Sequence, residues 1–318
     1  MFYCRICGNG EKNLSFIARE MMFGFRDEFE YYQCAECGCL QIKDIPSNIS
    51  KYYPENYYSY SNKNNNTLKN VYMKGKQYLE YKMAKQSLGQ GNFIGKMLAK
   101  KYDYPTWSEW IKIAKLRLDS MILDVGCGAG DLLLAMRRVG FSKLTGVDPY
   151  LEKDIHYENE VTVLKRSLNE LEGKYDFIML NHSFEHMDDP LPTLNNIHRL
   201  LSADQFALIR IPVVQCHAWE TYGVNWYQLD APRHFFLHTE KSMEILAAQA
   251  GFKVSKIVYD STGSQFWMSE GYVRGIPFAE QLKSPPFSKL EHNKFDEKAK
   301  VLNQEGRGDQ ACFFLQKI

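Results

Sequence analysis

Short apolar runs alternate with amphipathic stretches from residue 121 to the end of the chain. Seven of the apolar runs predict β-strands, at 121–125, 144–148, 161–164, 175–180, 205–211, 252–260 and 311–317. Apolar positions three and four apart predict helices at 131–139, 190–201 and 239–251. This alternation predicts an α/β fold whose mostly parallel sheet is covered by helices on both faces. The ligand of such a sheet lies at the carboxyl ends of its strands.

Residues 46–118 lack this alternation. Tyrosine, asparagine, serine and proline dominate the segment up to residue 66, and SNKNNN at 61–66 is the best linker candidate. Residues 67–118 have a helical pattern that glycines and one proline interrupt. Between Lys63 and Arg117 there are 12 Lys+Arg and 3 Asp+Glu, a local charge of +9 in a chain of net charge +1. This basic stretch is either a solvated helical face or a surface for a phosphate-bearing substrate.

Composition narrows the class of protein. Of the 318 residues, 45% are hydrophobic and 14% aromatic, which is typical of a globular chain and argues against disorder. No window of 18 residues is apolar throughout, so we expect no membrane-spanning helix. The opening sequence MFYCRICGNG lacks the pattern of a signal peptide, and we expect a cytoplasmic protein. The net charge argues against a protein whose whole surface binds nucleic acid.

Two C-x-x-C pairs lie near the N-terminus, and each is followed by glycine. A tight turn of this kind points both thiolates at one metal ion, and glycine permits the close approach of backbone N–H groups to sulfur. The spacing predicts a structural zinc site with four thiolate ligands, and the alternatives are buried thiols or disulfides. The predicted ligands are Cys4, Cys7, Cys34 and Cys37. We interpret the nearby Cys39 as a small core residue.

The first predicted strand of the α/β region runs into the sequence DVGCGAG, which ends at Gly130. Alternating glycines allow a tight turn and let a ligand touch the backbone. The second predicted strand ends at Asp148, 18 residues after Gly130. An acid in that position can accept hydrogen bonds from both hydroxyls of a ribose.

Three segments resemble the class I S-adenosylmethionine-dependent methyltransferases: ILDVGCGAG at 122–130, LTGVD at 144–148 and YDFIMLNHSFEHMDDP at 175–190. The pattern differs from the G-x-G-x-x-G of nicotinamide-binding proteins. The resemblance implies a Rossmann-like sheet of seven strands, mostly parallel, with the last strand antiparallel. It also implies a cofactor site, in which the glycines cradle the methionine part, Asp148 binds ribose, and Ser167 lies near the adenine. The implied cofactor residues are Asp124, Gly126, Cys127, Gly128, Gly130, Asp148, Pro149, Ser167, Leu168, Asn181 and His182.

Further segments look like a subset of these enzymes with an N-terminal zinc ribbon, whose members lie among genes for surface polysaccharides or sugar derivatives. They are 31–46, 51–58, 231–252 and 302–317. We therefore expect a zinc ribbon at 1–45, a linker and basic helical cap at 46–118, and a methyltransferase domain at 119–318. An insertion at about 261–310 is expected to form a substrate wall or a dimer contact.

The resemblance places catalytic candidates beside the reacting methyl group. A hydroxyl acceptor must lose its proton, and histidine suits that role because its ordinary pKa is about 6.5. The catalytic candidates are His186, His234 and Glu185, with a structural role as the alternative for each histidine. Arg233 either holds a substrate phosphate or carboxylate or pairs with a local acid, and Tyr222 and Trp226 either stack on a sugar or pack a lid. Relatives that bind a catalytic metal have glutamate where this chain has His182, so we expect no catalytic metal.

The sequence thus favours methyl transfer from S-adenosylmethionine to a hydroxyl of a small-molecule or glycan-type acceptor. An RNA methyltransferase is the alternative that the basic stretch supports, although nucleic acid is the less favoured partner. A non-catalytic cofactor-binding protein is the further alternative. The acceptor atom and the oligomeric state stay open.

Overall fold

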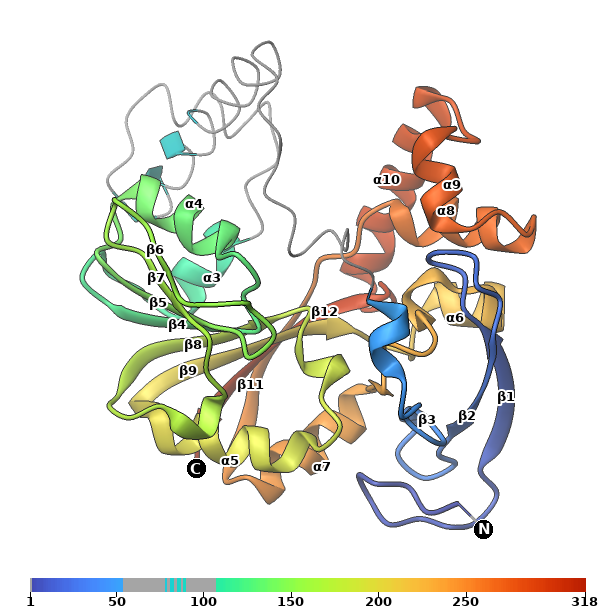
Figure 1. Ribbon diagram of the computed structural model, residues 1–318, viewed down its shortest axis with the longest axis horizontal. Helices are drawn as coiled ribbons and strands as arrows, with labels where there is room; N and C mark the ends of the chain where they lie inside the picture. Colours follow the sequence, from blue (N-terminus) through green and yellow to red (C-terminus); the bar gives the residue numbers. More distant parts are fainter. Residues whose placement is uncertain (1, 54–77, 79–80, 83–84, 87, 90–106) are drawn as a thin grey trace. The chain divides into compact units, whose positions relative to one another are not determined.

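The computed structural model describes residues 2–53, 78, 81–82, 85–86, 88–89 and 107–318 (Figure 1). The predicted linker at 61–66 and most of the predicted helical cap at 67–118 lie outside the described residues. The chain forms two compact units. Unit 1 comprises Met1–Pro54, His182–Asn195 and Ile209–Ile318, and unit 2 comprises Glu55–Asn181 and Asn196–Leu208.

Unit 2 contains the parallel part of the large sheet. Its central strand β4 (Met121–Val125) pairs in parallel with β5 (Lys143–Val147) and with β8 (Tyr175–Asn181). Beyond β5 lies β7 (Thr162–Leu164), also parallel. Helix α4 (Asp131–Val139) packs on β5, and α3 (Trp107–Ile113) precedes β4 (Figure 1). The run of four fully buried apolar residues in β8 is typical of a strand covered on both faces.

Strand β9 (Leu201–Pro212) starts in unit 2 and ends in unit 1, and the helix α5 (Pro190–Leu200) precedes it. In unit 1, β11 (Phe252–Tyr259) and β12 (Gln310–Lys317) form an antiparallel pair, and α7 (Glu240–Gln249) packs on β11. The hydrogen-bonded order of the large sheet is β11-β12-β9-β8-β4-β5-β7-β6.

This order confirms the predicted Rossmann-like α/β sheet and its antiparallel last strand, but the prediction of seven strands is wrong. The eighth strand, β6 (Ile155–His156), pairs antiparallel with β7 at the sheet edge. Two residues are too few to give an alternating pattern, so the periodicity of the sequence could not reveal it. Strand β9 also begins four residues before the predicted start at 205, because its polar first half lies outside the apolar run.

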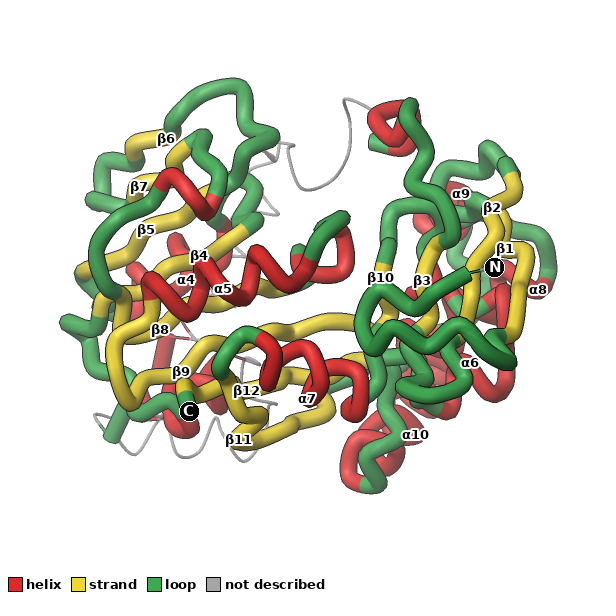
Figure 2. Tube along the Cα trace, turned by 90° about the horizontal axis from the view of Figure 1, so that it is seen from below, coloured by secondary structure: helices red, strands yellow, loops and turns green. Residues whose placement is uncertain are grey.

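A second, four-stranded sheet lies in unit 1, with the order β1-β2-β3-β10. Strands β1 (Leu14–Arg19), β2 (Glu28–Gln33) and β3 (Leu40–Ile42) belong to the N-terminal segment. Strand β10 (Phe236–Leu237) comes from far along the chain and pairs antiparallel with β3 (Figure 2). The cysteine-containing segment therefore shares its sheet with a strand beyond residue 45.

The segment between β11 and β12 folds into three helices, α8 (Ser264–Val273), α9 (Phe278–Lys283) and α10 (Lys289–Gln304). Phe266, Ala299 and Leu302 form a buried cluster between α8 and α10. The short helix α6 (His217–Tyr222) packs on α8. The insertion therefore has a small core of its own.

Candidate active site

The turn after β4 requires glycine for two physical reasons. Gly126, Gly128 and Gly130 have φ angles of 71°, 53° and 81°, which are in the left-handed region that favours glycine. A side chain at Gly130 would also collide, since an added Cβ would lie 2.7 Å from the Cγ2 atom of Val163. The glycine pattern in the sequence is therefore matched by the conformation that a tight, ligand-approaching turn needs.

Asp148 closes this turn from the end of β5. Its Oδ2 accepts a hydrogen bond from the Gly128 N–H at 3.0 Å, and its Oδ1 accepts one from the Tyr150 N–H at 2.9 Å. The Gly126 N–H donates to the Val147 carbonyl at 2.8 Å. These bonds fix the carboxylate beside the glycines, and its remaining lone pairs suit ribose hydroxyls.

Asp124 lies in β4 directly before the glycine turn and is buried. Burial raises the pKa of Asp124 to about 8, with a further contribution from the charge of Asp148. Burial also raises the pKa of the Cys127 thiol well above its ordinary value, so this cysteine is neutral and unreactive.

The other predicted cofactor residues follow the neighbouring strands. Ser167 and Leu168 lie at the start of the 3-10 helix η2 (Leu168–Glu170), and the Ser167 N–H donates to Glu170 Oε2 at 2.7 Å. Pro149 follows Asp148 directly, and Asn181 is the last residue of β8. Of the predicted cofactor residues, all except His182 belong to unit 2, and His182 belongs to unit 1. Their contacts with a cofactor stay predictions.

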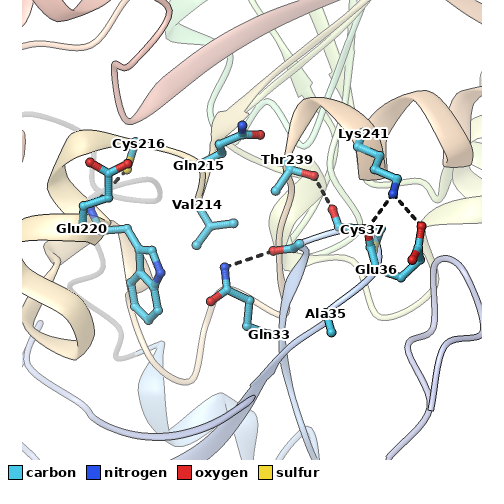
Figure 3. Close-up of a pocket in the computed structure, with 12 residues that line it drawn as sticks. Gln33, Ala35, Glu36, Cys37, Val214, Gln215, Cys216, Glu220, Thr239 and Lys241 are labelled. Carbon is cyan, nitrogen blue, oxygen red and sulfur yellow. Dashed lines mark hydrogen bonds and ion pairs between the residues drawn. The ribbon is translucent and has the colours of Figure 1, made fainter. Parts of the chain in front are cut away.

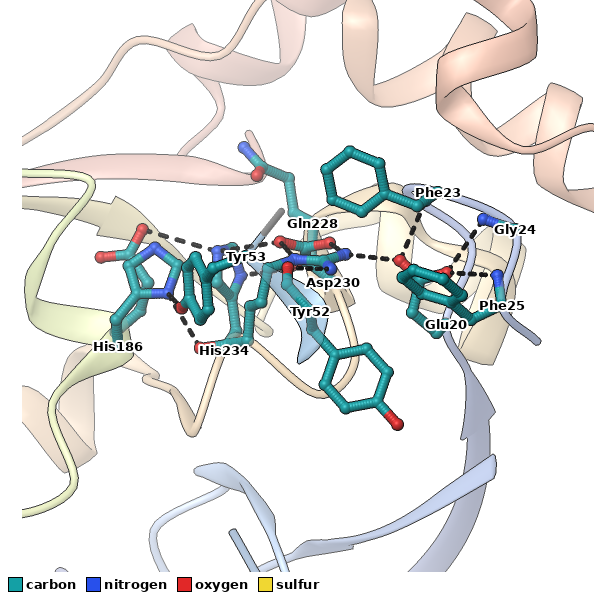
Figure 4. Close-up of polar contacts among 12 residues, drawn as sticks. Glu20, Phe23, Gly24, Phe25, Tyr52, Tyr53, His186, Gln228, Asp230 and His234 are labelled. Carbon is teal, nitrogen blue, oxygen red and sulfur yellow. Dashed lines mark hydrogen bonds and ion pairs between the residues drawn. The ribbon is translucent and has the colours of Figure 1, made fainter. Parts of the chain in front are cut away.

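A histidine and glutamate cluster in unit 1 begins directly after β8 (Figure 4). Glu185, in the 3-10 helix η3 (Phe184–His186), is fully buried, with Oε1 3.4 Å from His182 Nδ1 and 3.8 Å from His234 Nε2. The imidazole rings of His186 and His234 meet edge to face, with their centroids 4.7 Å apart. The structure thus brings together the three predicted catalytic residues and His182.

Charge explains why Glu185 is ionised. Burial alone raises the pKa of Glu185, but the proximity of His182 and the positive charge that His186, His234 and His182 carry when protonated outweigh that effect and lower the pKa. Among the described residues, neither carboxylate oxygen of Glu185 has a partner in hydrogen-bond geometry. A buried carboxylate without such a bond is costly, so the cluster is suited to receive a further donor.

The imidazoles of the cluster are oriented by backbone carbonyls. His234 Nδ1 lies 2.7 Å from the Gln228 carbonyl oxygen, and His186 Nδ1 lies 2.8 Å from that of Arg233. Because a carbonyl only accepts, each Nδ1 carries a proton. His186 Nε2 is then left as a proton acceptor, whereas His234 Nε2 faces two carboxylates, 3.8 Å from Glu185 Oε1 and 3.8 Å from Asp230 Oδ2. Burial, with the charge of His234, lowers the pKa of His186, so its neutral form is present at neutral pH.

The side chains of Glu185, His186 and His234 also form a set of the type that binds a metal ion. One nitrogen of each imidazole and one oxygen of Glu185 lie within 4.8 Å of one another. Two imidazoles and a carboxylate are also ligands that a divalent cation accepts.

The structure corrects the prediction of Arg233 as a substrate contact. Its guanidinium is fully buried, where it donates to Asp230 Oδ1 at 2.5 Å, to Glu20 Oε1 at 3.0 Å and to the Tyr52 carbonyl at 3.1 Å. Glu20 in turn accepts the N–H groups of a tight turn, from Phe23, Gly24 and Phe25 (Figure 4). The arginine therefore pairs with local acids and has no surface for a substrate anion.

Trp226 is a second correction. Its side chain is fully buried, and its indole N–H donates to Asp309 Oδ2 at 3.0 Å, so it packs and cannot stack on a sugar. Burial raises the pKa of Asp309 to about 6. Tyr222 is half-buried against the helical insertion, and its hydroxyl donates to Glu270 Oε1 at 3.0 Å. A substrate contact of Tyr222 stays a prediction.

Sequence reasoning missed Arg210 and Asp260. Arg210 Nη1 lies 2.7 Å from His182 Nε2, and its Nε donates to Asp260 Oδ2 at 2.7 Å. The signal was an arginine within the apolar run FALIRIP of β9, because a charge inside a buried strand needs a partner.

The four predicted zinc ligands lie together in unit 1. The Sγ–Sγ distances are 3.6 Å between Cys4 and Cys37 and 3.5 Å between Cys7 and Cys34, and none of the four forms a disulfide. Four thiolates around a tetrahedral zinc ion are about 3.8 Å apart, given Zn–S bonds of about 2.3 Å. The donor set fits zinc, and Cys39 lies buried outside it.

A cavity of about 450 Å³ opens in unit 1 beside this cysteine cluster (Figure 3). Its lining includes Gln33, Cys37, Trp219, Thr239 and Lys241. Thr239 Oγ1 donates to the Cys37 carbonyl, and Lys241 Nζ donates to the Glu36 carbonyl. None of the predicted catalytic residues lines this cavity.

Comparison with known proteins supports the fold. Residues 100–257 match a family described as a methyltransferase domain. The chain is 28% identical over 120 residues to the ribosomal protein L11 methyltransferase of Methylobacillus flagellatus, covering 36% of this chain and 40% of that protein. It is also 28% identical over 108 residues to a ubiquinone biosynthesis O-methyltransferase of Pseudomonas paraeruginosa, covering 30% of this chain and 46% of that protein. The chain thus spans less than half the length of these curated relatives.

Solved structures are similar at low sequence identity. A SAM-dependent methyltransferase from Archaeoglobus fulgidus is 18% identical, with a TM-score of 0.42, over 70% of this chain and 99% of that one. The domain match and the sequence relatives show that this part of the chain is similar to methyltransferases. Within the described part of the chain, no helix has the length and apolar character needed to cross a membrane.

Proposed function

We propose that this methyltransferase transfers a methyl group from S-adenosylmethionine to a hydroxyl of a small-molecule or glycan-type acceptor. The observation that carries the acceptor chemistry is the cluster that follows β8. It contains two imidazoles whose Nδ1 atoms are held by backbone carbonyls, next to a buried carboxylate, and His186 leaves its Nε2 as an acceptor. Such a cluster suits the removal of a hydroxyl proton.

The cofactor is expected at the glycine turn and Asp148. The left-handed glycines open the backbone to the methionine part, and the fixed carboxylate suits the ribose. Asp124, Cys127, Pro149, Ser167, Leu168 and Asn181 complete the proposed set. Bound S-adenosylmethionine supplies the methyl group, and its sulfur keeps the electron pair of the broken C–S bond.

Of the two imidazoles, His186 is the better candidate for the proton acceptor. It is partly exposed, whereas His234 is buried. In the proposed step the acceptor oxygen forms the new bond to the methyl carbon, and its proton moves to His186 Nε2. Glu185 then stabilises the imidazolium that forms.

The proposal also gives zinc a structural role in the N-terminal segment. Zinc on Cys4, Cys7, Cys34 and Cys37 has no open coordination position, so it would hold the N-terminal segment and take no part in the chemistry. The names of the two relatives give a ribosomal protein as the substrate of one and ubiquinone biosynthesis as the pathway of the other. The acceptor class of this chain must therefore be measured.

The test uses S-adenosylmethionine labelled in its methyl group. Purified protein is incubated with a nucleotide-sugar and glycan fraction, total RNA, and a protein fraction, each from the native cell. Label in the nucleotide-sugar and glycan fraction, lost in Asp148→Ala and in His186→Asn, supports the proposal. Label confined to RNA or protein overturns the acceptor class. Cofactor binding without label in any fraction favours the non-catalytic alternative.

A further inference from the structure

His182 has a backbone conformation that its neighbours must enforce. It is the first residue after β8 and has a φ angle of 53°, in the left-handed region that residues other than glycine rarely adopt. Its N–H donates to the Arg210 carbonyl at 2.9 Å. Such strained positions persist only where the surrounding structure fixes them. Strand β9 therefore holds the backbone of His182.

The side chain of the same arginine holds the imidazole. Arg210 Nη1 lies 2.7 Å from His182 Nε2. A guanidinium is always charged and has only donors, so His182 Nε2 must accept this hydrogen bond. An imidazolium has no acceptor nitrogen, so His182 is neutral in this arrangement and carries its proton on Nδ1. That nitrogen faces Glu185 Oε1 at 3.4 Å.

Asp260 fixes the orientation of the guanidinium. Arg210 Nε donates to Asp260 Oδ2 at 2.7 Å, and the two side chains are only 13% and 14% exposed. Asp260 Oδ1 accepts a further bond from Gln310 Nε2 at 2.7 Å. The guanidinium therefore has a fixed partner on each side, which favours a single direction for its Nη1 donor.

We infer that Arg210 is a positioning residue, which holds His182 as the neutral Nδ1–H tautomer and so keeps that N–H on the side of the buried carboxylate of Glu185, with Nδ1 3.4 Å from Oε1. This role rests on the proposed function, in which Glu185 supports the proton-accepting His186. Without Arg210, the Nε2–H tautomer becomes accessible, and an Nδ1 lone pair would then face the carboxylate. Four other titratable groups lie around Glu185. They are the imidazoles of His186, His234 and His238, and Asp230, which is paired with Arg233.

The first test measures the tautomer and needs no methyl transfer. The full, zinc-loaded chain is labelled with ¹⁵N-histidine, and His182 is assigned by the signals that disappear in His182→Asn. We expect wild-type His182 to show the neutral Nδ1–H pattern in long-range ¹H–¹⁵N spectra. We expect Arg210→Gln to show Nε2–H or a mixture, and Arg210→Lys to recover part of the Nδ1–H form. The control is Arg307→Gln, which removes an exposed arginine paired with Glu220.

An Nε2–H tautomer in the wild type, or an unchanged Nδ1–H tautomer in Arg210→Gln, would overturn the assignment. Arg210→Lys keeps a charged donor, so it remains informative if Arg210→Gln does not fold. Correct tautomers in a protein that transfers no methyl group would leave the positioning role intact and refute the proposed function instead.

The second test is a kinetic cycle. In the wild-type background, Arg210→Gln is expected to lower kcat/KM about tenfold, which is the order of one hydrogen bond to a charged group. His182→Asn places an amide donor near the position of Nδ1, and this donor needs no tautomer control. In that background, Arg210→Gln should cause no further loss of kcat/KM, and in neither background should Arg210→Gln change the affinity for S-adenosylmethionine. Equal losses in both backgrounds would show that Arg210 acts independently of His182 and would overturn the inference.

Discussion

Arg233 and Glu20 are 213 positions apart in the chain, yet Nη2 of the arginine lies 3.0 Å from Oε1 of the glutamate and both side chains are fully buried. The same guanidinium binds Asp230 and the Tyr52 carbonyl. One arginine thus joins the turn after β1, the segment that follows β3 and the loop before β10. This cluster ties the N-terminal segment to the rest of unit 1.

Arg233→Ala should destabilise the protein by about 3–5 kcal/mol, because it leaves two carboxylates buried without their cation. The matched control is Arg307→Ala, whose ion pair with Glu220 is exposed and should contribute less than about 1 kcal/mol. Urea unfolding followed by circular dichroism measures both. Equal effects of the two substitutions would contradict a central role for Arg233.

The zinc site can be tested separately from the chemistry. Cys34→Ala should lose zinc, lower the thermal midpoint and expose residues 2–53 to proteolysis, because metal binding stabilises a small module of this kind. Cys39→Ala is the control, since this cysteine is buried outside the four-thiolate set. Metal analysis of the purified chain measures the zinc content. A Cys34→Ala variant that keeps its zinc and its protease resistance would refute the site.

Local patterns predicted those parts of the site whose partners are near in sequence. The C-x-x-C pairs and the glycine turn depend on neighbouring residues, so spacing indicated them, whereas the resemblance to methyltransferases indicated Glu185 and His186. The role of Arg233 depends on Glu20, more than two hundred positions away, and the role of Arg210 depends on Asp260, the residue directly after strand β11. No periodicity encodes such pairings, because tertiary packing alone brings the partners together.

Asp148→Ala should weaken the binding of S-adenosylmethionine about 10- to 100-fold, since it removes charge-assisted hydrogen bonds to the cofactor and the acceptor for the Gly128 N–H. Calorimetric titration gives the dissociation constants. Asp189→Asn, a change at an exposed acid in the segment after η3, is the control. An unchanged affinity in Asp148→Ala would move the cofactor away from the glycine turn.

The stability of the cofactor-free protein should fall as the pH rises towards 8. Burial raises the pKa of Asp124 to about 8, from 3.8 for an ordinary aspartate, so the folded state disfavours its charged form. The stability linked to this group is complete below about pH 4 and is lost as the pH passes through the folded-state pKa. In Asp124→Asn this part of the pH dependence should disappear. Urea unfolding between pH 5 and 8.5 measures it, and identical slopes in both proteins would contradict the shift.

The pH dependence of methyl transfer tests the proton acceptor. His186 must be neutral to accept a proton, so kcat/KM should fall as the pH drops through its pKa, which burial lowers below the ordinary 6.5. The charge of Glu185 opposes that shift and raises the pKa of His186. Glu185→Gln should therefore move the acidic limb of the profile to lower pH. Lys298→Gln, at an exposed lysine of α10, should leave the limb in place. An acidic limb that moves to higher pH in Glu185→Gln, or that persists in His186→Asn, would show that another group accepts the proton.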